Sequence, residues 1–200
     1  VYDPSVSLRQ KDRDTDEIYI SYSTPKTQNR TYLYNIKTKE KKLVKEQIIP
    51  SGHEPNDYIV ERLECPSHDG RVVPITITRH KNTPIDGSAE LLLYGYGSYG
   101  HSMSPTFSST RLSLIKRNII WATAHIRGGM ERGMKWWKEG KLLNKKNTFK
   151  DYIACAKFLI EKKYTSKKKI IGMGGSAGGL LMGVVVNEEP DLFLGVIMAC

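Results

Sequence analysis

A glycine-rich segment constrains the fold of this chain more than any other stretch. Residues 172–179 read GMGGSAGG and contain the pattern G-x-S-x-G with Ser176 at its centre. An apolar β-type pair precedes the segment at 170–171, and a helix-compatible apolar stretch follows at 180–186. A strand that turns sharply into a helix around a serine is the context of a nucleophile elbow, in which the hydroxyl projects from the top of a sheet. We therefore predict an elbow with Ser176 on the turn.

The elbow interpretation also explains the glycines around the serine. Gly174 and Gly178 are expected because a Cβ at either position would collide with the neighbouring strand or helix. The N-terminus of the following helix would direct free N–H groups and a positive dipole end towards negative charge that forms beside the serine. An idle serine in a glycine-rich turn is one alternative. A phosphate-binding loop is disfavoured, because no Lys-Ser/Thr pair follows the glycines and G-x-G-x-x-G is met only loosely.

The first part of the chain has the pattern of an antiparallel sheet. Residues 17–23 and 30–36 alternate as half-buried strands do, and a turn at 37–40 leads to a further strand at 42–45. About three such strands are too few to close a barrel or a sandwich, and their exposed edge would need a partner. We therefore predict that residues 1–57 are the last piece of a larger β architecture and the linker that follows it.

From residue 58 the pattern changes to strands that alternate with helices. Strands are predicted at 58–65, 72–79, 91–94, 119–125, 169–172 and 194–199. Three helices are predicted: one at 112–117, one that begins at 148, and one that runs from the elbow to about 187. Thr148 and Asp151 form a capping-box pattern at the start of the second of these helices. Alternating strands and helices indicate parallel β-α-β units that are covered on both faces.

The charge of the chain does not by itself identify a partner. The formal net charge is +10, and lysines cluster at 39–45, 135–150 and 162–169. Neither a helix-turn-helix pattern nor an RNA-binding signature accompanies them, so we interpret the clusters as solvated faces and predict no nucleic-acid partner. No apolar run approaches the roughly eighteen residues of a membrane span, and no membrane association is expected.

Cysteine usage favours a reducing compartment. The three cysteines, Cys65, Cys155 and Cys200, are far apart in sequence and odd in number. This pattern suits free thiols better than a disulfide framework. We therefore predict a cytoplasmic protein.

A second glycine-rich segment is a candidate partner of the elbow. A serine hydroxyl needs a base to take its proton, and the oxyanion that forms needs preplaced donors. One donor in an elbow is the N–H of the residue after the serine, here Ala177, and another comes from the loop after the third strand. That loop is YGYGSYG at 94–100, where glycines permit a tight turn and a tyrosine hydroxyl can donate. A plain Gly/Tyr turn is the alternative for this segment taken alone.

Four blocks occur in one order along the chain: LYGYGSYG at 93–100, AHIRGG at 124–129, GKLLNKKNTF at 140–149 and GMGGSAGG at 172–179. Together they resemble the prolyl oligopeptidase family of serine peptidases, and most closely its oligopeptidase B branch. The resemblance covers nearly the whole chain. It includes the β-rich start, which is similar to the end of the family's β-propeller.

The resemblance implies an α/β-hydrolase fold for residues 58–200, as the N-terminal part of its doubly wound sheet. It implies cleavage of short peptides after Arg or Lys, with no cofactor and no metal. It assigns Ser176 as nucleophile, Ala177 as backbone oxyanion donor and Tyr96 as side-chain oxyanion donor, and it places Tyr99 near the specificity pocket. An acylaminoacyl-peptidase or esterase with the same elbow, and a non-catalytic basic binding module, are the alternatives.

The order of the catalytic residues departs from this pattern. The triad of the fold runs Ser, Asp, His along the chain, but the residues after Ser176 include one Asp, Asp191, and no His. We expect Asp191 in a loop at a helix end and His125 in a structural role. The chain is therefore predicted to be a fragment with little or no turnover of its own. Its expected partners are peptide substrates and the remainder of the polypeptide, or a complementary fragment, that supplies the acid and the base.

Overall fold

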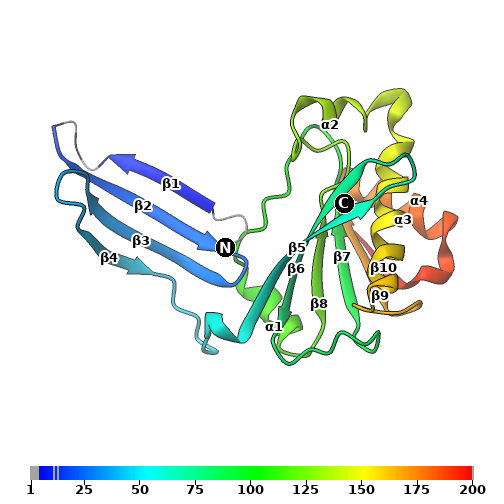
Figure 1. Ribbon diagram of the computed structural model, residues 1–200, viewed down its shortest axis with the longest axis horizontal. Coiled ribbons are helices and arrows are strands. Elements are labelled where there is room, and N and C mark those ends of the chain that lie inside the picture. Colours follow the sequence, from blue (N-terminus) through cyan, green and yellow to red (C-terminus); the bar gives the residue numbers. More distant parts are fainter. Residues whose placement is uncertain (1–4, 11, 13, 200) are drawn as a thin grey trace.

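The computed structural model describes residues 5–10, 12 and 14–199, and its strands form two separate sheets (Figure 1). The first sheet is antiparallel in the order β1-β2-β3-β4. Its strands are β1 (Ser5–Gln10), β2 (Glu17–Thr24), β3 (Thr27–Asn35) and β4 (Lys41–Glu46). About three strands were expected in this sheet, and the structure has four. The unpredicted strand is β1, which is defined by its pairing with β2 and has no clear strand pattern in its sequence. Four antiparallel strands are also the unit of which propeller blades consist.

The second sheet is mixed and has the order β10-β9-β7-β8-β6-β5. Its strands are β5 (Tyr58–Pro66), β6 (Val72–His80), β7 (Leu91–Gly95), β8 (Ile120–Ala124), β9 (Ile170–Gly175) and β10 (Phe193–Ala199). Strands β5 and β6 form the predicted hairpin, and β6 also pairs antiparallel with β8. Strands β8, β7, β9 and β10 run parallel to one another. The predicted α/β class is confirmed.

Helices cover both faces of the mixed sheet, as the buried strands require. They are α1 (Ser109–Ile115), α2 (Met134–Lys138), α3 (Lys146–Glu161) and α4 (Ala177–Glu188), with 3-10 turns η1 (Pro55–Asp57), η2 (Leu142–Asn144) and η3 (Pro190–Leu192). Leu91 and Leu93 of β7 pack in one core with residues of α3 and α4. Leu92 points the other way and packs with Leu112 and Ile115 of α1.

Helix α3 begins differently from the prediction. It starts at Lys146, so Thr148 lies inside its first turn. The Thr148 hydroxyl donates to the carbonyl oxygens of Arg127 at 2.8 Å and Gly140 at 3.2 Å. The Asp151 carboxylate accepts from the Arg127 guanidinium instead of capping the helix. The predicted capping box is therefore wrong, because both of its side chains make tertiary contacts.

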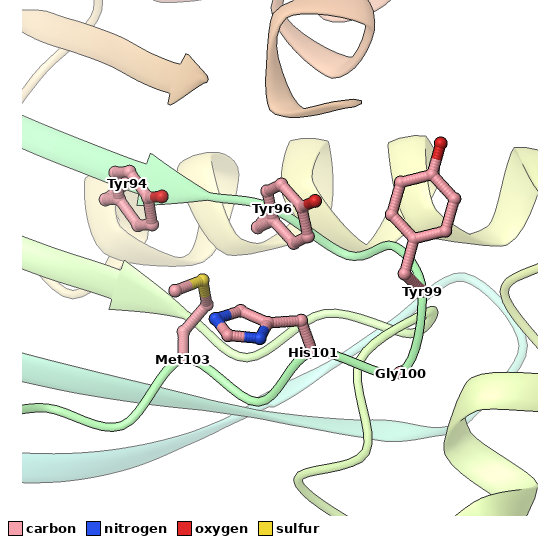
Figure 2. Close-up of a pocket in the computed structure, with 6 residues that line it drawn as sticks. All are labelled: Tyr94, Tyr96, Tyr99, Gly100, His101 and Met103. Carbon is pink, nitrogen blue, oxygen red and sulfur yellow. The ribbon is translucent and has the colours of Figure 1, made fainter. Parts of the chain in front are cut away.

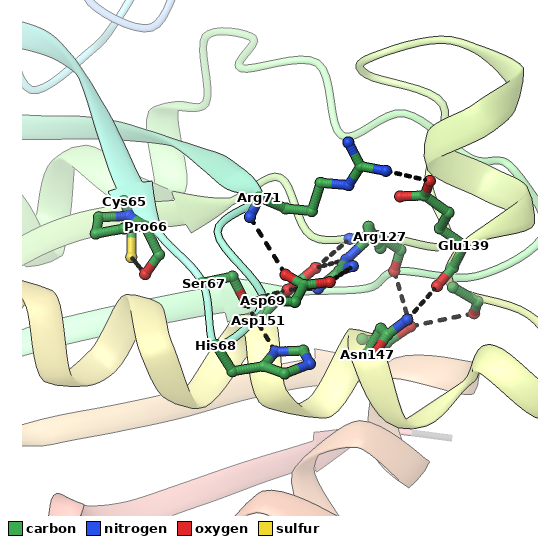
Figure 3. A network of polar contacts seen from close by, with 12 residues as sticks. Cys65, Pro66, Ser67, His68, Asp69, Arg71, Arg127, Glu139, Asn147 and Asp151 are labelled. Carbon is green, nitrogen blue, oxygen red and sulfur yellow. Dashed lines mark hydrogen bonds and ion pairs between the residues drawn. The ribbon is translucent and has the colours of Figure 1, made fainter.

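A buried ion-pair network joins the β5–β6 hairpin, the segment after β8 and helix α3 (Figure 3). The Arg127 side chain is only 1% exposed and contacts Asp151 at 2.6 Å and Asp69 at 2.6 Å. Ser67 donates to the same Asp151 carboxylate at 2.6 Å. Burial lowers the pKa of Arg127, but the hydrogen bonds and charges of the two carboxylates outweigh it and raise the pKa overall. Arg127 is therefore a permanent cation at the centre of the network.

Two cysteines lie in the described part of the chain, and both Cys65 and Cys155 are buried free thiols. Cys200 lies outside the described residues. Burial raises the pKa of Cys155, which keeps it a thiol rather than a reactive thiolate. Within residues 5–10, 12 and 14–199, no helix combines the length and the apolar character needed to cross a bilayer.

Candidate active site

Ser176 is the residue at which β9 ends and α4 begins. Its backbone has φ 53° and ψ −119°, a combination that non-glycine residues rarely adopt, and the residue is exposed. The Ser176 N–H donates to the carbonyl of Ala199 at 2.7 Å, and its carbonyl accepts from the N–H of Gly179 at 2.8 Å. The turn is therefore held by backbone hydrogen bonds on both sides of a solvent-facing serine.

The two glycines of the G-x-S-x-G pattern lie where a side chain does not fit. A Cβ on Gly174 would lie 2.3 Å from the carbonyl oxygen of Gly178. A Cβ on Gly178 would lie 2.9 Å from the carbonyl oxygen of Gly95 and 3.6 Å from the ring of Tyr96. The expected collisions are confirmed. They also show how closely the start of α4 approaches β9 and the end of β7.

This close approach predicts an effect on stability. Replacing Gly174 by alanine should lower the free energy of unfolding by about 1–3 kcal/mol, because the clash is with backbone that cannot rotate away. Gly183, in the interior of α4, has no atom within 4 Å of a built Cβ. Its replacement by alanine is the matched control and should stabilise the protein by about 0.5–1 kcal/mol. Urea unfolding of the two variants measures both values, and equal effects would contradict the steric argument.

The loop that follows β7, residues 96–100, is here named the tyrosine loop. The Gly178 distances place Tyr96 against the first turn of α4, so the structure brings Tyr96 and the elbow together. Tyr96 also lines a cavity of about 440 Å³. Figure 2 shows its lining residues, with the Tyr94 and Tyr96 hydroxyls pointing the same way: Tyr94, Tyr96, Tyr99, Gly100, His101 and Met103.

Tyr99 lies on the rim of this cavity. Its φ is 57° and its side chain is 81% exposed, so little packing holds the ring. Figure 2 shows the ring standing away from Tyr96, with its hydroxyl outward. Tyr99 is thus at the site, and its contribution to specificity stays a prediction.

Helix α4 begins at Ala177. The N–H groups in the first turn of a helix have no acceptor within that helix, and the helix dipole places positive potential around them. The N–H of Ala177 is the first of these groups and belongs to the residue after Ser176. In a nucleophile elbow the backbone oxyanion donor comes from this position, and for Ala177 the role stays a prediction.

His125 and Asp191 make contacts that fit the structural roles expected of them. The Nε2 atom of His125 lies 2.8 Å from the Thr76 hydroxyl and 2.9 Å from the Arg62 guanidinium, and the ring is buried. Asp191 lies in the turn after α4, where its carboxylate is 80% exposed and 3.5 Å from the Lys168 ammonium. The Nδ1 atom of His125 lies 3.6 Å from the Glu131 carboxylate, and among the described residues neither His125 nor Asp191 hydrogen-bonds the Ser176 hydroxyl.

Lys145 is a residue of the site that the sequence reasoning missed. The lysine cluster at 135–150 was interpreted as a solvated face, but Lys145 is only partly exposed. Its Nζ donates to the carbonyl oxygen of Gly97 at 2.6 Å and to the hydroxyl of Ser98 at 2.7 Å. Both acceptors belong to the tyrosine loop. The only sequence signal for this contact was the position of Lys145 in one of the four blocks.

Comparison with known proteins gives relatives over nearly the whole chain. Residues 105–200 match the model of the prolyl oligopeptidase family. The chain is 44% identical to dipeptidyl aminopeptidase BI of Pseudoxanthomonas mexicana over 180 residues. These aligned residues are 90% of this chain and 25% of that protein. It is 39% identical over 192 residues to protease 2 of Moraxella lacunata, covering 96% and 28% respectively.

Solved structures agree with these sequence relatives. Oligopeptidase B from Leishmania major matches with a TM-score of 0.89 and 36% identity, over 99% of this chain and 28% of that one. Oligopeptidase B from Trypanosoma brucei with covalently bound antipain matches with a TM-score of 0.90 and 35% identity, over 99% and 28%. The chain thus spans about a quarter of the length of these relatives. Sequence, fold and the geometry around Ser176 agree that the chain belongs to the prolyl oligopeptidase family.

Proposed function

We propose that this chain provides the nucleophile and the oxyanion hole of a serine peptidase that hydrolyses short peptides. The observation that carries the proposal is the exposed, strained Ser176 at the first turn of α4, with Tyr96 packed against that turn. A strained turn of this kind is costly, and such turns persist mainly where function requires them. The membership of the chain in a peptidase family supports the same function.

The proposed reaction uses three groups of this chain. The Oγ of Ser176 attacks the carbonyl carbon of the scissile bond while a base takes its proton. The N–H of Ala177 and the hydroxyl of Tyr96 donate to the oxyanion that forms. The amine then leaves with the proton that the base held, and water hydrolyses the ester that remains on Ser176. Each donor of this kind contributes roughly 10²–10³ to kcat in acyl transfer.

The base and the acid are proposed to come from outside these residues. All five histidines precede Ser176 in the sequence, and the Nε2 atom of His125 is engaged by Thr76 and Arg62. The remainder of the same polypeptide, or a complementary fragment, would supply the His and the Asp. The 200-residue chain by itself is therefore expected to turn over little or no substrate.

We propose cleavage after Arg or Lys as the specificity. The likeness to protease 2 and to oligopeptidase B supports this choice. The residues that line the cavity beside Tyr96 include no Asp, Glu, Lys or Arg, and most are aromatic, so they suit the aliphatic stem of a basic side chain. The acidic groups for its charged end would come from outside the described lining. Release of dipeptides is a second candidate, favoured by the 44% identity to a dipeptidyl aminopeptidase.

We also propose a division of the chain and a compartment. Residues 1–57 would be the end of a propeller with its linker, and 58–200 part of the peptidase domain. The separation of the strands into two sheets supports this division. A cytoplasmic location is proposed from the free thiols of Cys65 and Cys155.

A fluorophosphonate probe tests the nucleophile directly. The purified 200-residue chain, and separately the chain extended to its natural stop codon, are treated with the probe, and the label is located by mass spectrometry. We expect label on Ser176 in the extended chain and none in its Ser176→Ala variant. Label on Ser176 in both chains would mean that these residues contain a base, and His125 would be tested next. No label in either chain would overturn the serine-peptidase proposal.

A further inference from the structure

We propose that Lys145 is a positioning residue, which holds the tyrosine loop in the geometry that Tyr96 needs to donate to the oxyanion. The proposal rests on the function proposed above and assigns a new part of its site. The direct observation is the pair of hydrogen bonds from the Lys145 ammonium, to the Gly97 carbonyl at 2.6 Å and to the Ser98 hydroxyl at 2.7 Å. Both acceptors lie between Tyr96 and Tyr99.

Apart from its two hydrogen bonds and the Phe149 ring, whose centroid lies 5.9 Å from Nζ, the surroundings of Lys145 do little to stabilise a cation. Lys145 directly precedes α3, so its charge lies near the positive end of the helix dipole. The side chain is half-buried, and this burial lowers its pKa. Among the ion pairs of the described residues, none joins Lys145 to a carboxylate. A half-buried lysine at a helix N-terminus without a carboxylate partner departs from the usual placement of charges, and such departures are expected at functional sites.

The tyrosine loop needs an external hold because it contains two flexible glycines and a strained tyrosine. Gly97, Tyr99 and Gly100 all have positive φ, at 65°, 57° and 68°. This region is unfavourable for a tyrosine, and the exposed Tyr99 ring gains little packing in return. A loop of this kind keeps one conformation only where its surroundings fix it.

Backbone and packing contacts fix both ends of the loop, and Lys145 adds its hydrogen bonds at the near end. The N–H of Gly100 donates to the carbonyl of Gly128 at 2.9 Å, which ties the far end of the loop. At the near end, the Gly97 peptide packs on Thr148 of α3, where a Cβ would lie 2.5 Å from the threonine methyl group. Lys145 is the side-chain donor that holds this near end, one residue after Tyr96. Its loss would free the peptide next to the proposed oxyanion donor.

The test compares variants of the full-length protein on a fluorogenic peptide with Arg at P1. Lys145→Met keeps the apolar stem and removes the donor. It should lower kcat by about tenfold to a hundredfold, less than the roughly 10²–10³ for loss of a whole oxyanion donor, and change KM less than twofold. Lys145→Gln keeps a neutral donor, so its kcat should lie between that of Lys145→Met and that of the parent. Lys146→Met, at an exposed neighbour, should leave kcat unchanged.

A double-mutant cycle with Tyr96→Phe separates positioning from general stability. Where Lys145 acts through Tyr96, Lys145→Met should cost less than twofold in kcat once the Tyr96 hydroxyl is gone. An equal loss in both backgrounds, or an unchanged kcat in Lys145→Met alone, would overturn the proposal. Urea unfolding checks each variant, and if Lys145→Met does not fold, the same cycle is run with Lys145→Gln.

The outcome also distinguishes this proposal from the one on which it rests. A parent protein in which the fluorophosphonate probe does not label Ser176 would overturn both. A labelled parent with no coupling between Lys145 and Tyr96 would overturn only the positioning role.

Discussion

Replacing Ser176 by alanine should lower kcat of the full-length protein by about 10⁶, the size of the loss known when the serine of a catalytic triad is removed. The hydroxyl forms the covalent intermediate, so no neighbouring group replaces it. The oxyanion donors of Ala177 and Tyr96 would remain, and binding with these donors should leave roughly 10³–10⁴ over the uncatalysed reaction. Initial rates at saturating fluorogenic peptide measure the loss. A kcat within tenfold of the parent would contradict the assignment of the nucleophile.

The structure provides a reason why this variant should still fold. The Ser176 side chain is exposed, and the backbone hydrogen bonds to Ala199 and Gly179 do not involve its hydroxyl. Substitutions at exposed positions that remove no cap, buried contact or buried hydrogen bond usually change the free energy of unfolding by less than about 0.5 kcal/mol. The strained φ of residue 176 costs alanine and serine a similar amount, so it does not separate the variant from the parent. Coincident urea transitions for variant and parent would therefore show that lost activity reflects lost chemistry.

The elements that sequence predicted best are those whose pattern is local. The parallel strands of the mixed sheet carry short apolar runs, the β5–β6 hairpin is bounded by a turn signal, and the elbow carries its own glycines, so all were predicted close to their observed bounds. Helix α2 was not predicted, because Met134–Lys138 contains two lysines and no helical periodicity. It is held by Trp136, which is buried and donates through its indole N–H to the carbonyl of His125 at 3.0 Å. Such a contact joins separate segments and leaves no local pattern.

The same distinction applies to the site. The motif was sufficient to place Ser176 and Ala177 on the elbow, and the resemblance led to Tyr96. The contact of Lys145 with the tyrosine loop joins residues that are 48 and 47 positions apart. Thr148 and Asp151 match a capping-box pattern in the sequence but do not cap the helix, because both side chains form hydrogen bonds with Arg127 instead. Side-chain contacts between residues that are distant in the sequence could therefore not be predicted from local sequence patterns.

The ion-pair network below this site should be the most sensitive point of the fold to a single change of charge. Asp151 is fully buried and accepts from Arg127 and Ser67. Asp151→Asn keeps the shape of the side chain but leaves the buried guanidinium with Asp69 as its only carboxylate partner in the network. Breaking a buried pair in this way costs about 3–5 kcal/mol, because the remaining charge stays desolvated. The free energy of unfolding from urea titration is the measurement.

A second ion pair of α3 offers a matched control for that value. Lys157 contacts Glu189 at 2.6 Å, with side chains that are 53% and 37% exposed. Solvent screens such a pair, so Lys157→Met should change the free energy of unfolding by no more than about 1 kcal/mol. If both variants lost the same small amount, the network would not be the anchor of this region. A large loss confined to Asp151→Asn would instead show that Arg127 fixes α3, and with it Lys145 and the tyrosine loop, against the β5–β6 hairpin.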